Sequence, residues 1–189
     1  MNAAPVIAIL GLSGSGKSHL AKAIVRARPD ILRMTAGSLL RRSFHTTGEK
    51  LRTAESDHVR DNQFELASAL ACERTGQLDR PVLLEAHAFI DNDRELVDVP
   101  SDVMASLGLA AIILVDAPAT EVLRRRSLDT RKRPRRNIAE LRLQRRRLRE
   151  LGEIYTAALD IPLLRIDSGN RARAIAFVDA IIASSNSPP

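Results

Sequence analysis

The chain has 189 residues, of which 44% are hydrophobic and only 3% aromatic, so it has the size of one domain with an aliphatic core. Its net charge of +6 favours an anionic partner such as phosphates or nucleic acid, with a basic solvated surface as the alternative. The single cysteine, Cys72, excludes an intramolecular disulfide and is expected in the core. The apolar run at 6–10 is too short for a signal peptide or a membrane span. The sequence therefore predicts a cytoplasmic protein without a membrane partner.

Short apolar runs alternate with longer amphipathic segments along the chain. The apolar runs predict buried strands at 5–10, 31–36, 82–84, 110–115 and 162–166. The segments between them predict helices at 15–28, 37–44, 57–78, 101–107, 120–127, 138–159 and 171–183. Residues 45–56, 90–100 and 130–137 are predicted to be irregular connections, and the Ser/Pro tail 184–189 is predicted to be disordered. Five strands that alternate with helices imply a single α/β domain over 1–189, with a parallel sheet covered on both faces.

The connection after the first strand carries a complete phosphate-binding motif. Residues 11–18 read G-L-S-G-S-G-K-S and match the P-loop pattern G-x-x-x-x-G-K-[ST] in full. The glycines let successive backbone N–H groups turn toward a phosphate, Lys17 supplies a cation for the β- and γ-phosphates, and Ser18 supplies a hydroxyl for Mg²⁺. The sequence therefore predicts ATP and Mg²⁺ as ligands, with nucleotide contacts at Gly11, Ser13, Gly14, Ser15, Gly16, Lys17 and Ser18.

A P-loop alone does not separate kinases from other nucleotide-binding proteins, but the segments that follow it are more specific. The N-K-x-D run of GTPases is absent, and the chain is short for an AAA+ motor. Residues 35–41, T-A-G-S-L-L-R, resemble the S-T-G-D-x-L-R segment of adenylate kinases, and residues 82–87, V-L-L-E-A-H, resemble the strand and D-T-H of the archaeal type. The arginine-rich run at 124–133 resembles the short lid of the same group. In this order, the motifs resemble archaeal-type adenylate kinases and related nucleoside monophosphate kinases.

The resemblance implies a P-loop NTPase fold with a five-stranded parallel sheet in the order 2-3-1-4-5. It implies an acceptor-binding region at about 36–78 and a lid at about 126–137, with phosphoryl transfer from Mg-ATP to a nucleoside monophosphate. It assigns catalysis to Lys17, Arg126, Arg131 and Arg133. It assigns acceptor binding to Gly37, Ser38, Arg41, Arg52 and His87, the adenine side of ATP to Asp167 and Asn170, and Mg²⁺ to Ser18 and Glu85.

Several of these positions have a second interpretation. His87 is either an acceptor contact or a buried structural histidine, and Asp116 is either a second carboxylate near the magnesium or a helix N-cap. The sequence departs from the family pattern at Ala36, Ser38 and Glu85, which stand for threonine, aspartate and aspartate. These departures lie at positions that contact the acceptor and the metal in the family. The identity of the acceptor base is therefore implied by the resemblance alone.

Two other functions compete with the nucleotide kinase. Thirteen basic residues lie within 124–149, which suits an RNA- or ribosome-associated ATPase, although the segment has few aromatic residues for base stacking. Arg124 and Arg125 are expected to face solvent, as are most arginines of 142–149, with Arg142 and Arg146 the better candidates for facing the lid. The third function is a P-loop kinase for a different small acceptor.

Overall fold

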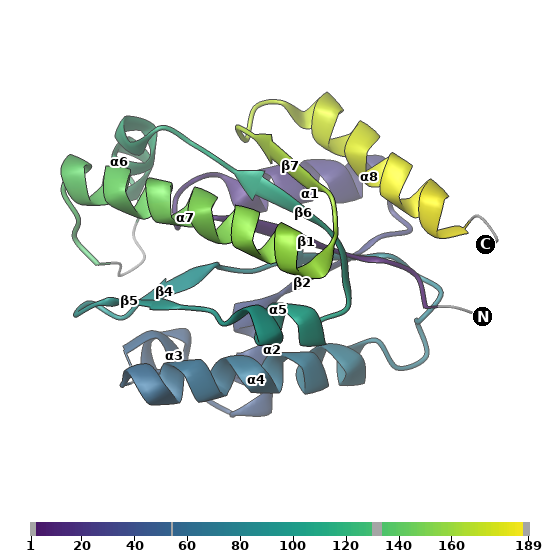
Figure 1. Ribbon diagram of the computed structural model, residues 1–189, viewed down its shortest axis with the longest axis horizontal. Coiled ribbons are helices and arrows are strands. Elements are labelled where there is room, and N and C mark those ends of the chain that lie inside the picture. The colour runs from purple at the N-terminus through teal and green to yellow at the C-terminus, as the bar shows by residue number, and fades with distance from the viewer. Residues whose placement is uncertain (1–2, 54, 130–133, 187–189) are drawn as a thin grey trace.

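The computed structural model describes residues 3–53, 55–129 and 134–186 (Figure 1). The strands are β1 (Val6–Gly11), β2 (Leu32–Thr35), β3 (Val82–Glu85), β4 (Phe89–Asp91), β5 (Leu96–Asp98), β6 (Leu109–Val115) and β7 (Leu163–Ile166). The helices are α1 (Lys17–Ala27), α2 (Ala36–Ser43), α3 (Gly48–Thr53), α4 (Ser56–Glu73), α5 (Ser101–Ser106), α6 (Ala119–Ser127), α7 (Ile138–Leu159) and α8 (Arg171–Asn186).

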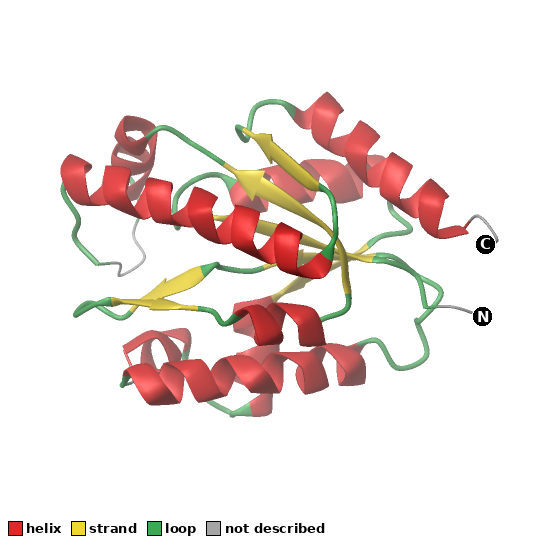
Figure 2. Cartoon of the chain, viewed as in Figure 1, coloured by secondary structure: helices red, strands yellow, loops and turns green. Residues whose placement is uncertain are grey.

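Five strands form one parallel sheet in the order β2-β3-β1-β6-β7 (Figure 2). Numbered along the chain within this sheet alone, the order is 2-3-1-4-5, which confirms the predicted P-loop kinase fold. The labels differ because β4 and β5 form a separate two-stranded sheet. Residues 3–53, 55–129 and 134–186 contain no helix of the length and apolarity that crossing a membrane needs.

The sheet is buried on both faces because its strands are apolar at nearly every position. In β1, Ile7 and Ile9 face α1 and α8, while Ala8 and Leu10 face the side that α2, α4, α5 and α7 cover (Figure 1). All four residues are at most 1% exposed. The carboxyl ends of the strands lie at one edge of this buried sheet, where the P-loop and the segments after β2 and β3 begin.

The hairpin β4–β5 replaces the irregular connection that the sequence predicts at 90–100. Its strands pair antiparallel, with Ile90 opposite Val97. The hydroxyl of Tyr155 on α7 lies 2.9 Å from the carbonyl oxygen of Ala88 and 2.5 Å from that of Val99, so it ties both ends of the hairpin to the helix. Each strand has only three residues, and this length is too short for a periodic signal.

Three other differences concern helices. The connection predicted at 45–56 contains α3, and α8 continues to Asn186 and so includes three residues of the predicted tail. In α4 the buried positions are Gln63, Leu66 and Leu70, whereas Phe64 is 45% exposed. Cys72 lies on the exposed side of that helix, so its predicted place in the core is wrong.

Candidate active site

The P-loop lies between the end of β1 and the start of α1. Gly14 and Gly16 have φ values of 89° and 99°, a region that L side chains rarely adopt, so both positions need glycine. Lys17 is 8% exposed, and its Nζ donates to the carbonyl oxygens of Gly11 at 2.5 Å and Leu12 at 3.1 Å. The glycines thus permit the turns of the loop, and the lysine is folded back onto two carbonyl groups of that loop.

Ser18 and Glu85, the two predicted magnesium ligands, lie together at the start of α1 and the end of β3. Ser18 Oγ donates to Glu85 Oε2 at 2.6 Å, and the Glu85 side chain is 5% exposed. Mg²⁺ prefers oxygen ligands and is commonly held by one or two protein groups together with substrate phosphates. The donor set therefore fits Mg²⁺ with a bound triphosphate. No group of three or more His, Cys, Asp and Glu that would suit another metal occurs in the part of the chain that the structure describes.

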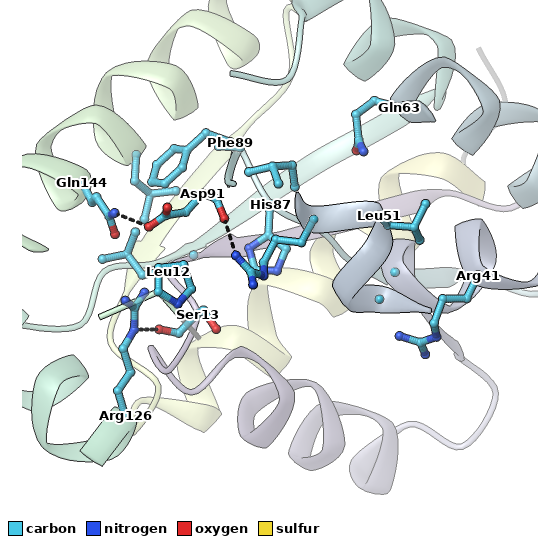
Figure 3. Close-up of a pocket in the computed structure, with 18 residues that line it drawn as sticks. Leu12, Ser13, Arg41, Leu51, Gln63, His87, Phe89, Asp91, Arg126 and Gln144 are labelled. Atoms are coloured by element: carbon cyan, nitrogen blue, oxygen red, sulfur yellow. Dashed lines mark hydrogen bonds between the residues drawn. The ribbon is translucent and has the colours of Figure 1, made fainter. Parts of the chain in front are cut away.

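Two consecutive arginines of α6 bind the outer side of the P-loop. Arg126 Nε donates to the carbonyl oxygen of Ser13 at 2.8 Å (Figure 3), and Arg125 Nη1 donates to that of Ser15 at 2.7 Å. Glu121 accepts from Arg125 Nε at 2.7 Å, one helical turn away. Arg126 was predicted to act near the phosphates and does lie at the loop. The expectation that Arg125 faces solvent is wrong.

The turn after β7 also meets the P-loop. Ser168 is 6% exposed, and a Cβ built at Gly16 would lie 2.5 Å from its Oγ. The predicted nucleotide contacts Asp167 and Asn170 are exposed on either side, and Asp167 Oδ1 accepts from the backbone N–H of Gly169 at 2.7 Å. Ser168 is thus the residue of this turn that approaches the loop. Nucleotide contacts by Asp167 and Asn170 stay a prediction.

A cavity of about 300 Å³ opens beside residues 11–13 of the P-loop. Four of the five predicted acceptor residues line it, namely Gly37, Arg41, Arg52 and His87. Figure 3 shows Arg126 and Ser13 on one side of this cavity, Arg41 on the far side, and His87 between them. The structure thus brings the predicted donor and acceptor residues around one space.

Ser38, the fifth predicted acceptor residue, acts on Arg41 instead of lining the cavity. Its backbone N–H donates to Thr35 Oγ1 at 3.1 Å, which caps α2, and its Oγ accepts from Arg41 Nη2 at 2.9 Å. The guanidinium of Arg41 lies over two glycines, since Cβ atoms built at Gly37 and Gly48 would lie 3.8 Å and 3.4 Å from Nη1. Ser38 and the two glycines therefore position Arg41.

The tip of the hairpin connects the acceptor region to the segment after the lid. Arg52 Nη1 pairs with Asp93 at 2.8 Å, and Arg136 Nη2 pairs with Asp91 at 2.8 Å. Gln144 Nε2 of α7 donates to the same Asp91 carboxylate at 2.9 Å (Figure 3). The predicted catalytic residues Arg131 and Arg133 lie outside the described residues. The hairpin thus ties together three elements that surround the cavity.

Asp116, at the end of β6, is held by two arginines of α7. Its carboxylate accepts from Arg145 Nε at 2.5 Å and from Arg149 Nε at 2.9 Å. Burial acts to raise the pKa of the Asp116 carboxyl, but the hydrogen bonds from both arginines outweigh it, so the pKa lies below its usual value. The N-cap of α6 is Pro118, so the capping role for Asp116 is wrong, and its carboxylate is already committed to Arg145 and Arg149.

Seven arginines of the segment 124–149 form ion pairs within the part of the protein that the structure describes. Carboxylates pair with Arg124, Arg125, Arg136, Arg145, Arg146, Arg147 and Arg149. These side chains come from α6, from α7 and from Arg136 just before it, and their partners lie on those helices, the hairpin and the end of β6. These arginines are therefore engaged in ion pairs within the protein, which does not support the RNA interface that the sequence suggested.

The comparison with family models decides the family. A model described as an AAA domain matches residues 10–142, well over half of the chain and including the P-loop. The chain belongs to this family. No curated protein matches the chain by sequence.

Solved structures of similar fold include shikimate kinases. The enzyme from Bacteroides thetaiotaomicron has a TM-score of 0.60 and 16% identity, covering 96% of this chain and 99% of that one. The enzyme from Acinetobacter baumannii, described in complex with shikimate, has a TM-score of 0.61 and 13% identity over 98% and 96%. The enzyme from Aquifex aeolicus has a TM-score of 0.56 and 16% identity over 95% and 97%. At this identity the likeness shows the fold alone.

Several polar residues of the site were missed from the sequence. Gln63 and Gln144 line the cavity and are 8% and 3% exposed, and Arg33 pairs with Glu85. Gln144 had a signal, because it lies on the helical stripe that contains Leu141 and Leu148. Arg33 had no such signal, because β2, which carries Arg33, and β3, which carries Glu85, are separated along the chain by most of the acceptor region.

Proposed function

We propose that this protein transfers the γ-phosphoryl group of ATP to a small anionic acceptor bound in the cavity beside the P-loop. One observation carries the proposal: a single cavity joins P-loop residues 11–13 to Arg41 and Arg52 on one side and Arg126 on the other. Phosphoryl transfer needs alignment and charge stabilisation more than covalent chemistry. Arginine suits both tasks, because its guanidinium is permanently charged and binds anionic oxygens bidentately.

The donor half has an assigned residue for each part of the triphosphate. Lys17 would exchange the carbonyl oxygens of its own loop for the β- and γ-phosphates, a more favourable partner for a cation. Ser18 and Glu85 would hold Mg²⁺, which supplies positive charge to the phosphate oxygens when bound. Arg126 would shield the transferring group from the α6 side, with Arg131 and Arg133 proposed to add to it from the lid.

The acceptor half selects for an anionic group. Arg41 bonds to Ser38, and in residues 3–53, 55–129 and 134–186 it has no carboxylate partner, which leaves its charge for the acceptor. A nucleoside monophosphate, which the adenylate kinase resemblance implies, offers a phosphate to it. Shikimate, named for one of the structural neighbours, offers a carboxylate. Both are therefore members of the proposed acceptor class.

The size and lining of the cavity favour a compact acceptor. A volume of about 300 Å³ lies at the lower end of the range of about 300–1,000 Å³ that is usual for ligand sites. Leu12, Leu51, Phe89 and Leu148 give it an apolar wall between the charged ends. A small ring that carries one acidic group fits this description better than a whole nucleotide does.

A coupled assay with Mg-ATP and an acceptor panel tests the proposal. The panel contains the common nucleoside monophosphates, shikimate and other small hydroxylated carboxylates and phosphates. We expect ADP formation to depend on one class of acceptor. ADP formation that is independent of every acceptor, at a rate that none of them raises, would contradict a kinase and favour an ATPase.

Arg41 and its neighbour Arg42 provide a matched pair for the acceptor site. Arg42 lies on the outer side of α2 and pairs with Glu73 at 2.9 Å. Hydrogen bonds to charged groups contribute about 1.5–3 kcal/mol, so Arg41→Ala should lower kcat/KM for the acceptor by about 10- to 100-fold. The KM for ATP should stay within about twofold, by the small effect of distant substitutions. Arg42→Ala should change neither constant, and an equal loss for ATP and acceptor in Arg41→Ala would disprove the assignment.

A further inference from the structure

Glu85 carries a carboxylate that is nearly buried beside the P-loop and has a separate donor for each oxygen. Ser18 Oγ donates to Oε2 at 2.6 Å, and Arg33 Nε donates to Oε1 at 2.7 Å. Arg33 Nη2 lies 2.5 Å from the same Oε1. The predicted metal ligand is therefore already neutralised by a cation of this chain.

The parallel pairing of β2 and β3 sets up this contact. Thr35 is opposite Glu85 in the register, and Arg33 is opposite Leu83, two residues earlier. The long arginine side chain reaches forward along the sheet to the carboxylate, and it stays 29% exposed while Glu85 is 5% exposed. The guanidinium thus covers the solvent side of a carboxylate that would be costly to bury alone.

We propose that Arg33 sets the Mg²⁺ requirement of nucleotide binding, by holding Glu85 in an ion pair with which the metal must compete. This inference rests on the proposed binding of Mg-ATP at the P-loop. A divalent cation that approaches Glu85 and Ser18 meets the positive charge of Arg33 at hydrogen-bond distance from the same carboxylate. Mg²⁺ must therefore either displace the guanidinium from Glu85 or bind close to its positive charge. Each alternative lowers the affinity of the site for Mg²⁺.

The consequence is a metal site that fills together with the nucleotide. The phosphates of ATP bring negative charge and further oxygen ligands, which offset the repulsion from Arg33. Without them, Ser18 and Glu85 offer two ligands, one of which is in an ion pair. Arg33 is thus a positioning residue that keeps Glu85 paired until Mg-ATP arrives.

The test measures Mg²⁺-dependent binding of a non-hydrolysable ATP analogue to the full chain, by calorimetry or fluorescence, without an acceptor. An adjacent charge commonly shifts the equilibrium of a carboxylate by about one to three powers of ten. We expect Arg33→Met to lower the half-saturating Mg²⁺ concentration by at least about tenfold, the low end of that range. Arg33→Lys keeps the charge and should stay within about threefold of the wild type, by the same argument. Direct titration with Mg²⁺ alone should show binding in Arg33→Met at concentrations where the wild type shows none.

Three controls keep the inference falsifiable. Arg26→Met removes one positive charge from the exposed side of α1 and should leave the Mg²⁺ requirement unchanged. If Arg33→Met fails to fold, Arg33→Gln retains an amide donor for Glu85 and carries the test. In a Glu85→Gln background, Arg33→Met should lose its effect on Mg²⁺.

The outcomes separate this inference from the proposed function. An unchanged or raised half-saturating Mg²⁺ concentration in Arg33→Met and Arg33→Gln overturns the inference, as does a wild-type chain that binds the analogue without Mg²⁺. Because the readout is binding, a protein that behaves as expected here and transfers no phosphoryl group supports the role of Arg33 and refutes only the kinase.

Discussion

Glycine at position 16 carries two requirements that a matched pair of substitutions separates. Its φ is 99°, and a Cβ there would lie 2.5 Å from Ser168 Oγ, 2.7 Å from Ser168 Cβ and 2.7 Å from Arg125 Nη1. Gly76, in the turn after α4, has a φ of 78° with no atom within 4 Å of a built Cβ. Gly76→Ala therefore measures backbone strain alone, and Gly16→Ala measures strain together with the close approach of the turn after β7 and of α6 to the P-loop.

The structure gives different magnitudes for the two variants. A left-handed conformation costs a non-glycine residue about 1–2 kcal/mol, which is the whole effect expected for Gly76→Ala. Forcing a methyl group into a packed region adds about 1–3 kcal/mol, because the Cβ of Ser168 is not a mobile group that can turn away. At about 2–4 °C per kcal/mol for a chain of this size, Gly76→Ala should lower Tm by about 2–8 °C, and Gly16→Ala should lower it further.

Nucleotide binding distinguishes the variants more sharply than stability does. Gly16→Ala displaces the turn and the arginine that touch the loop, so we expect the affinity for Mg-ATP to fall by more than about tenfold, the equivalent of about 1.4 kcal/mol. Gly76→Ala should bind Mg-ATP like the wild type. Melting curves and a nucleotide titration of both proteins give the answer. Equal Tm losses, or unchanged affinity in Gly16→Ala, would refute the close-approach argument.

Two further predictions concern the packing of α7. Gly152→Ala should lower the free energy of unfolding in urea by about 1 kcal/mol. A Cβ at this position would lie 2.5 Å from Leu114 Cδ1, and the cost of this overpacking exceeds the gain of about 1 kcal/mol in helix propensity. A more stable variant would show that Leu114 gives way, and Gly152→Ala with Leu114→Val should recover stability. The Asp116 carboxyl has a lower pKa in the folded state than its unfolded value of 3.8, so its stabilisation is present above that pH and is lost as the pH falls through the folded pKa. Asp116→Asn should therefore show a shallower loss of unfolding free energy below about pH 4 in acid titrations, and a slope identical to that of the wild type would contradict the role of Arg145 and Arg149.

The donor half of the site was predictable because its information is local. The apolar run of β1, the glycines and the lysine are contiguous, and each has a chemical task that its residue type fulfils. The five sheet strands were found for the same reason, since each is an uninterrupted apolar run between turn residues. The departures from prediction lie mainly where distant segments meet, as at the hairpin and at the arginines of α6 and α7.

The hairpin and the pairing of charges were not predictable, because they depend on contacts between distant segments. Asp91 and Asp93 belong to the connection predicted at 90–100. In the structure Asp91 pairs with Arg136, which lies more than forty residues later in the chain, and Asp93 pairs with Arg52, which lies about forty residues earlier. The same holds for the arginine-rich run of α6 and α7, which reads as a nucleic-acid surface until its carboxylate partners are in place. Composition shows that charges exist, and only the fold shows which of them cancel.

The two halves of the site therefore differ in how they are built. In the proposed site one contiguous loop would supply the donor contacts, whereas the wall of the acceptor cavity combines residues from α2, α3, α4, the hairpin and α7. A substitution in that wall changes one contact with the acceptor and leaves the backbone cradle of the P-loop intact. The choice of acceptor can thus change while ATP binding is retained. For this reason the motif at 11–18 indicates the phosphoryl donor, and the acceptor has to be determined by experiment.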